Sequence, residues 1–313
     1  MTEPWASPDA AAGPGPTAGP VPMQPTRSDA KPRTGPDEEP AAFPIPLRPL
    51  SLADVLDTAF DLIRARPKTF AAIAIVFVVP GQLLIAWYSR DLLGGSTLVD
   101  LFEDPDSVDD SGGSTALVMV ALLVDSIVLP FVAAAVAHVV VWWHDPGRCG
   151  AASALGATFR RSWPLFAGWF VAHVLQAAGI LAVWVGVPVM MAFTAVVAPA
   201  IAVERIGPLK AVGRSFRLVS SRFFPTLWRV LAVATVATVL GWVLPVLPVA
   251  VGLFVGFDVG WIISAIAGII TSLLTTSFVA ATAVVMYFDL RIRREGMDVE
   301  MRVAEVFAAR PTP

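Results

Sequence analysis

Residues 162–203 read SWPLFAGWFVAHVLQAAGILAVWVGVPVMMAFTAVVAPAIAV, and His173 is the one side chain among them that can carry charge. The hydrocarbon core of a bilayer is about 30 Å thick, so one helical crossing takes about 20 residues at 1.5 Å rise per residue. A single crossing would leave half of this stretch without an apolar environment. The stretch therefore predicts two membrane crossings joined by a short turn.

The composition of the whole chain points to the same class of protein. Hydrophobic residues make up 56% of the 313 residues, charged residues make up 15%, and the mean hydropathy is +0.71. Soluble domains typically carry about 25% charged residues. We predict an all-α integral membrane protein that crosses the cell membrane several times.

Six apolar windows are long enough to cross a bilayer. They lie at about residues 70–88, 116–143, 164–184, 186–203, 226–255 and 259–288. In a six-span protein, nearly all Lys and Arg residues that flank these windows fall on one side, and positive loops are retained in the cytoplasm. The first loop on the other side, about residues 89–115, has seven acidic residues against Arg90. We therefore predict that both termini are cytoplasmic.

The formal net charge of −3 averages an acidic outer loop with a basic cytoplasmic face. Anionic lipid headgroups attract juxtamembrane Lys and Arg by about 1 kcal/mol each, so we expect the lipid bilayer to be the partner of that face. No nucleic-acid partner is indicated. A second membrane protein, or a second copy of the chain, is the other partner that we expect.

The two ends of the chain differ in composition from the apolar windows. Residues 1–46 are rich in Pro, Ala and Gly, which predicts a disordered cytoplasmic tail or a Pro-rich docking segment. Residues 47–292 form the predicted six-span membrane domain, and residues 293–313 form a short cytoplasmic C-terminal tail. Cys149 is the single cysteine, and we assign it no role.

The windows are organised in three similar units. Before the first, third and fifth windows, an amphipathic stretch has an apolar residue followed four positions later by Phe, at Leu56 and Phe60, Leu155 and Phe159, and Val212 and Phe216. Each unit ends with an acidic residue shortly before Arg, at Asp145 and Arg148, Glu204 and Arg205, and Asp289 and Arg291. Amphipathic helices of this kind lie in the headgroup plane. We predict three repeats of an interfacial helix plus a helical hairpin.

Two interfacial segments carry further signals. Ser51 followed by Asp54 predicts a capping box at the start of the first segment. In the third segment Lys210, Arg214 and Arg217 share one basic face. That face either anchors the protein at the membrane surface or binds lipid headgroups or a protein partner.

Three stretches carry a resemblance to a known family: PLRPLSLADVLDTAFDLIRARP (residues 46–67), APAIAVERIGPLKAVGRSFRLVSSRFF (198–224) and MYFDLRIRREGMDVE (286–300). They resemble the multi-pass actinobacterial proteins called glycerophosphoryl diester phosphodiesterase membrane domain, and the likeness covers most of residues 47–300. In the enzymes that gave this family its name, a separate barrel with a His-Arg-Gly start is catalytic. Here His138, His144 and His173 are followed by Val, Asp and Val. We predict no enzyme activity, no catalytic residue, no metal and no cofactor.

Polar side chains occur at similar depths inside the apolar windows. At helical rise, Asp125 lies roughly 13 Å from the outer edge, and Gln82 and Gln176 lie roughly 18 Å from the cytoplasmic edge. A carboxylate at the bilayer centre costs about 2.5 to 3.5 kcal/mol, so Asp125 should face other helices. We predict a cluster of Gln82, Asp125, Ser126 and Gln176. The cluster either joins helices through hydrogen bonds or binds a proton or cation.

The sixth window has a small residue at every fourth position. Gly260, Ser264, Gly268 and Ser272 form one face, on which another helix can approach closely. We predict that this face packs inside the bundle or between two copies of the chain.

These features favour a non-enzymatic multi-pass protein that acts as a scaffold, regulator or assembly partner at the cytoplasmic face of the cell membrane. The alternative hypothesis is a transporter or lipid-handling protein that uses the polar cluster around Asp125 as its site.

Overall fold

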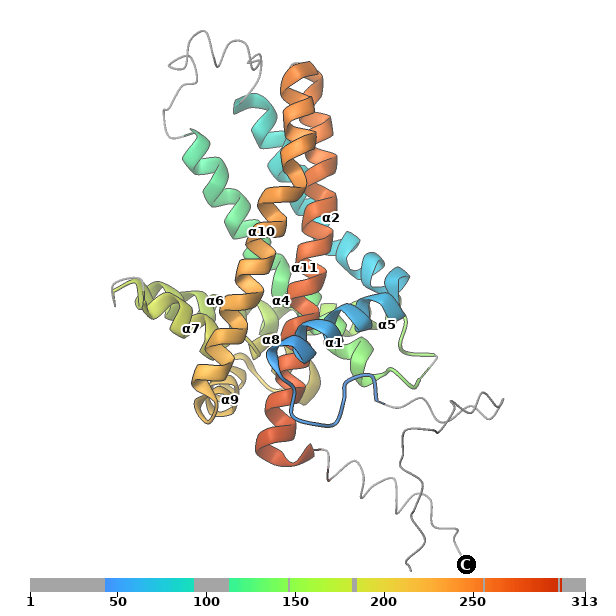
Figure 1. The fold of residues 1–313 in the computed structure, drawn as a ribbon, viewed down its shortest axis with the longest axis vertical. Coiled ribbons are helices and arrows are strands. Elements are labelled where there is room, and N and C mark those ends of the chain that lie inside the picture. Colours follow the sequence, from blue (N-terminus) through green and yellow to red (C-terminus); the bar gives the residue numbers. More distant parts are fainter. Residues whose placement is uncertain are drawn as a thin grey trace, which may run out of the picture. The chain divides into compact units, whose positions relative to one another are not determined.

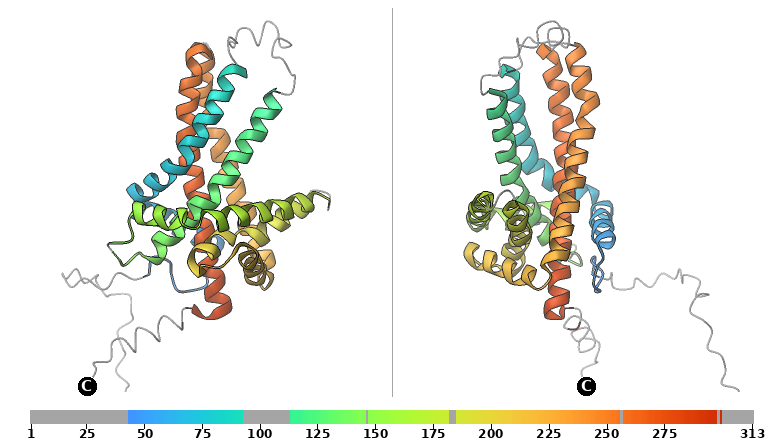
Figure 2. Two further views of the ribbon diagram at one scale, coloured as in Figure 1. Left: turned by 180° about the vertical axis from the view of Figure 1, so that it is seen from behind. Right: turned by 60° about the vertical axis from the view of Figure 1, so that its left-hand side comes forward.

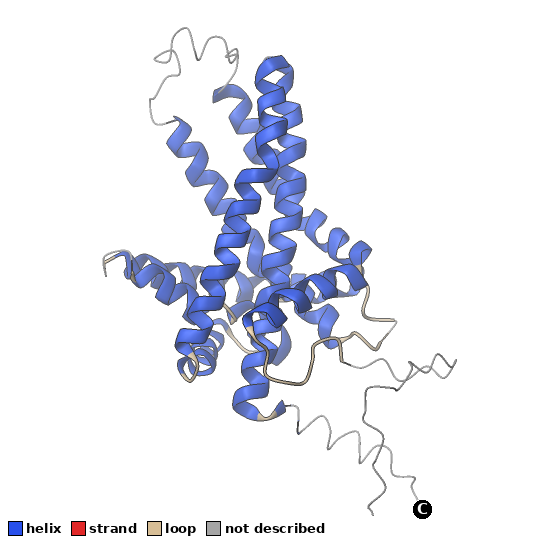
Figure 3. Cartoon of the chain, viewed as in Figure 1, coloured by secondary structure: helices blue, strands red, loops and turns tan. Residues whose placement is uncertain are grey.

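The computed structural model describes residues 43–92, 113–145, 147–181, 185–255, 257–297 and 299. Within these ranges all regular structure is helical (Figure 3). The helices are α1 (Leu52–Ala65), α2 (Pro67–Leu92), α4 (Gly113–Val141), α5 (Ala151–Phe159), α6 (Ser162–Ile180), α7 (Gly186–Thr194), α8 (Val197–Glu204), α9 (Pro208–Ser220), α10 (Phe223–Val255) and α11 (Phe257–Glu295). Residues 1–42 of the predicted disordered tail and most of the acidic loop lie outside the described residues. The last residues of that predicted tail pack on the helices instead, since Ile45 is fully buried and Phe43 contacts the ring of Phe288.

Six helical segments are long and apolar enough to cross a membrane. They are Pro67–Trp87, Met119–Val141, Ser162–Ile180, Gly186–Glu204, Phe223–Gly252 and Trp261–Glu295. The prediction of an all-α chain with six apolar segments of spanning length is confirmed. The agreement has a simple cause, because uninterrupted apolar runs of this length are nearly always helical in membrane proteins.

The fourth segment is divided into α7 and α8 at Ala195 and Val196. Pro199 lies in the first turn of α8, and its ring nitrogen has no hydrogen to donate to the carbonyl group of Ala195. A continuous helix would need that hydrogen bond. The interruption is therefore found one turn before Pro199.

The pair of α6 and α7 runs crosswise to the long helices α2, α4, α10 and α11 (Figures 1 and 2). The two helices approach each other closely where Gly179 meets Gly186: a Cβ atom added at Gly186 would lie 2.3 Å from the carbonyl oxygen of Gly179. The lengths and the polarity of these helices were predictable from the sequence. The angle between this hairpin and the long helices was not.

The short amphipathic helices pack in a regular order. Helix α5 contacts α4, helix α9 contacts α8, and helix α1 contacts α11. Helix α2 also contacts α11, and α10 contacts α7. The predicted capping box of α1 is confirmed, since Ser51 accepts from the Asp54 amide and Asp54 accepts from the Ser51 amide at 2.8 Å.

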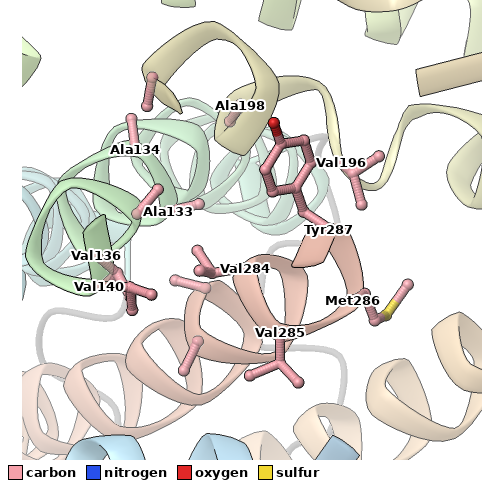
Figure 4. Close-up of a cluster of buried hydrophobic side chains, with 14 of the residues drawn as sticks. Ala133, Ala134, Val136, Val140, Val196, Ala198, Val284, Val285, Met286 and Tyr287 are labelled. Atoms are coloured by element: carbon pink, nitrogen blue, oxygen red, sulfur yellow. The ribbon is translucent and has the colours of Figure 1, made fainter. Parts of the chain in front are cut away.

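The core lies where α4, α8 and α11 meet (Figure 4). Residues 132–140 of α4 are all buried and include a run of Ala and Val, so this part of the helix is enclosed on every side. Its small side chains let α8 and α11 approach closely. Tyr287 of α11 is among the largest fully buried side chains, and it packs beside α8.

Candidate functional site at the charged helix ends

Asp289, near the end of α11, is the centre of a buried charged cluster. Its carboxylate is fully buried and accepts from the Leu50 amide at 2.8 Å, from Arg229 Nη1 at 2.6 Å and from Arg293 Nε at 3.0 Å. Both Arg229 and Arg293 also donate to the carbonyl oxygen of Leu50. The cluster therefore joins the segment before α1, the start of α10 and the end of α11.

Glu204, the last residue of α8, forms a second cluster with α9 and α11. It accepts from Arg214 Nε at 2.7 Å and from the Tyr287 hydroxyl at 2.8 Å. Arg214 also donates to Glu295 at 2.8 Å, and Glu295 accepts from Arg291 at 3.0 Å. The carboxylates of Glu295 and Glu204 raise the pKa of the Arg214 guanidinium above its ordinary value.

Near α5, the acidic residue Asp145 has no close ion pair comparable with those of Asp289 and Glu204 in the described part of the chain. Asp145 accepts from the Gly147 amide at 3.1 Å and lies 4.0 Å from Arg148. Arg66, at the end of α1, donates to the carbonyl oxygen of Trp143 at 3.1 Å and lies 4.5 Å from the centre of its ring. Arg66 Nη1 also lies 2.9 Å from the sulfur of buried Cys149.

The three acidic residues that end the predicted units therefore have distinct partners. Asp145 lies near its sequence neighbour Arg148, whereas Glu204 binds Arg214 and Asp289 binds Arg229. The contacts of these four residues were not predicted from the sequence: Arg229, Tyr287, Arg293 and Glu295. A usable signal was present: Arg229 is the fourth residue of the window 226–255 and the single charged residue in it.

No protein-family model, curated protein or solved structure matches the chain.

On α9, the three basic residues of the predicted face have different environments. Arg214 is half-buried in its ion pairs, whereas Lys210 and Arg217 are exposed. All three line an open pocket together with Glu204, Ile206 and Gly213. Helix α9 thus has one arginine that holds it in place and two cations directed to the surroundings.

The residues of the predicted polar cluster form three separate hydrogen bonds. Gln82 of α2 donates to Asp125 of α4 at 3.0 Å. Ser126 accepts from the Trp169 indole at 3.3 Å. Gln176 donates to Thr194 at 3.1 Å, across the pair of α6 and α7. The structure thus brings Asp125 to one of the two proposed glutamines and places the other with a hydroxyl group.

Helix α11, which carries the predicted small-residue face, contacts α2 and α10. A Cβ atom added at Gly268 would lie 3.4 Å from Gln82 Oε1, so the absence of a side chain leaves room for that glutamine. The Ser264 hydroxyl is buried and has no hydrogen-bond partner among the described residues. Ser272 is half-buried, and the surroundings of Gly260 lie outside the described side chains.

Proposed function

We propose that the chain is a non-enzymatic multi-pass protein of the cell membrane that serves as a scaffold or assembly partner through the basic surface of α9. The observation that carries the proposal is the contrast within α9: Arg214 is fixed between Glu204 and Glu295, while Lys210 and Arg217 are exposed.

The ion pairs matter because they make the surface rigid before it binds. Helix α9 packs on α6, α7 and α8, and Arg214 ties it to the end of α11. A surface held in this way loses little conformational entropy when it binds a membrane or a protein. The exposed cations then supply the attraction, at about 1 kcal/mol each for anionic lipid.

The test is a double substitution, Lys210→Gln with Arg217→Gln, which leaves the Arg214 ion pairs in place. We expect the purified variant to keep its thermal stability and to lose in-cell crosslinks to neighbouring membrane proteins or its preference for anionic lipid. Arg64→Gln with Lys68→Gln removes the same charge from α1 and α2 and is the matched control. Unchanged crosslinks and unchanged lipid preference in the α9 variant would refute the proposal.

We further propose that the chain consists of three repeated units, with both termini on the cytoplasmic side. The packing order supports the repeat. Helix α5 contacts α4, the last helix of the first unit, and α9 contacts α8, the last helix of the second unit. Helix α1 contacts α11, the last helix of the third unit. The basic flanks of the spanning segments support the orientation. With Cys149→Ser as background, a thiol reagent that does not cross membranes should label Ser107→Cys from outside and leave Ser221→Cys unlabelled. The opposite pattern would reverse the orientation.

A further inference from the structure

An apolar cavity of about 270 Å³ lies between α4, the pair of α6 and α7, α8, α10 and α11. Its walls are mainly Ala, Val, Leu, Ile and Met. The polar side chains that reach it include Ser126, which accepts from Trp169, and Gln176, which donates to Thr194. His173 also lines the cavity, with its Nδ1 at 2.9 Å from the carbonyl oxygen of Trp169. Because most of the lining is apolar, the cavity suits an apolar occupant.

Two of the wall helices carry a cation one turn beyond the cavity. Leu165 of α6 lines the cavity, and Arg161 lies four residues earlier at the helix N-cap. Ile201 of α8 lines the cavity, and Arg205 lies four residues later at the C-cap. Four residues correspond to about 6 Å along a helix.

Arg161 and Arg205 are both close enough to the buried His138 of α4 to act on it electrostatically, as is Arg160. Within the described part of the chain, no ion pair is found for Arg161 or Arg205. Arg205 also has a φ of +54°, a left-handed conformation that is uncommon for a residue other than Gly.

We propose that the cavity binds one hydrocarbon chain of a lipid with an anionic headgroup, and that Arg161 and Arg205 bind the headgroup. This site is separate from the α9 surface, and the proposal does not depend on the function proposed for it.

The two cations favour a lipid over a second protein segment as the occupant. Arg161 and Arg205 lie one helical turn beyond the apolar walls, which matches a lipid whose anionic headgroup lies next to its hydrocarbon chain.

The headgroup must provide the selectivity. Lipid chains are as apolar as Leu, so a chain that moves from the bilayer into this cavity gains packing contacts and no net hydrophobic energy. Each basic residue near anionic lipid contributes an attraction that amounts to about fivefold in affinity. Two arginines therefore predict a preference of about 25-fold for an anionic over a zwitterionic lipid at low salt.

The experiment uses the tryptophan in the cavity wall. Trp169 lines the cavity, and bromine atoms on a lipid chain quench its fluorescence on contact. The full-length protein in mild detergent is titrated with brominated phosphatidylglycerol or brominated phosphatidylcholine. The difference between wild type and Trp169→Phe gives the quenching of Trp169 itself. We expect half-maximal quenching at a concentration of phosphatidylglycerol at least fivefold lower than that of phosphatidylcholine.

Two variants with matched controls test the two parts of the site. Ala172→Phe fills the cavity and should abolish the saturable quenching, whereas Ala177→Phe on the exposed face of α6 should not. Arg161→Gln with Arg205→Gln should make the two lipids equivalent, whereas Arg64→Gln should not. Free glycerol phosphate should not displace the brominated lipid, since it lacks a chain.

The comparison of the two brominated lipids on the wild-type protein does not depend on whether any variant folds. Equal quenching by the two lipids, or quenching that does not saturate, would overturn the proposal. Displacement of the lipid by glycerol phosphate alone would show a phosphate site without a chain site, and would also overturn it.

Discussion

Replacement of Asp289 by Asn should destabilise the protein strongly. The carboxylate is fully buried, and the side chain of Arg229 beside it is 9% exposed. Asn would remove the negative charge and leave the Arg229 cation buried without a counter-charge. Breaking a buried ion pair in this way costs about 3 to 5 kcal/mol. Arg293 does not relieve the loss, because it is also a cation and approaches the same carboxylate at 3.0 Å.

The assay is thermal unfolding of the purified protein in mild detergent, followed by circular dichroism. A loss of 3 to 5 kcal/mol corresponds to a fall in Tm on the order of 10 °C. Arg148→Gln is the control, because Arg148 is exposed and lies 4.0 Å from Asp145, and such pairs contribute at most about 1 kcal/mol. If Asp289→Asn unfolds within 2 °C of wild type, the inference that this cluster holds α1, α10 and α11 together is wrong.

Three further predictions concern other parts of the structure. Gly186→Ala should lower the Tm in the same assay, because the new Cβ atom would lie 2.3 Å from the α6 backbone. Gly241→Ala is the control: no atom lies within 4 Å of the new Cβ atom, so the free energy of unfolding should rise by about 0.5 to 1 kcal/mol. The hydrogen bond from Arg48 lowers the pKa of Asp54, so the contribution of Asp54 to the start of α1 should be complete above about pH 4 and lost as the pH falls through the folded-state pKa. Hydrogen exchange of the α1 amides, corrected for intrinsic rates, should therefore accelerate on acidification in wild type and not in Asp54→Asn. Asp125→Asn keeps an acceptor for Gln82 and should change stability by less than about 1 kcal/mol; a larger stabilisation would instead indicate an acid that is retained for function.

The helices were predictable because their signals are local. Each apolar window is a run of neighbouring residues, and its length can be compared directly with the thickness of a bilayer. The start of α1 was predictable for the same reason, since Ser51 and Asp54 are three residues apart and satisfy each other's backbone amides.

The partners of the charged residues were not predictable in this way. Asp289 binds an amide 239 residues away and an arginine 60 residues away. The sequence pattern has an acidic residue shortly before an arginine at the end of each unit, but it does not indicate a partner for either residue. On a helix, residues at positions i and i+1 or i+2 point in different directions, so Glu204 and Arg205, or Asp289 and Arg291, are poorly placed to interact. Arg293, at position i+4 from Asp289, is on the same face and does contact it.

The direction of the pair of α6 and α7 also depends on distant contacts. The base of α6 packs where Gly168 admits Ile201 of α8 and Val197 beside it. Helix α8 is itself fixed between α4 and α9 by Glu204 and its buried residues. The break before Pro199 then lets α7 leave at an angle that a continuous helix would forbid. The apolar cavity lies between this hairpin and helices α4, α8, α10 and α11. The local effect of one proline on a backbone hydrogen bond therefore contributes to the shape of the space proposed to bind a lipid chain.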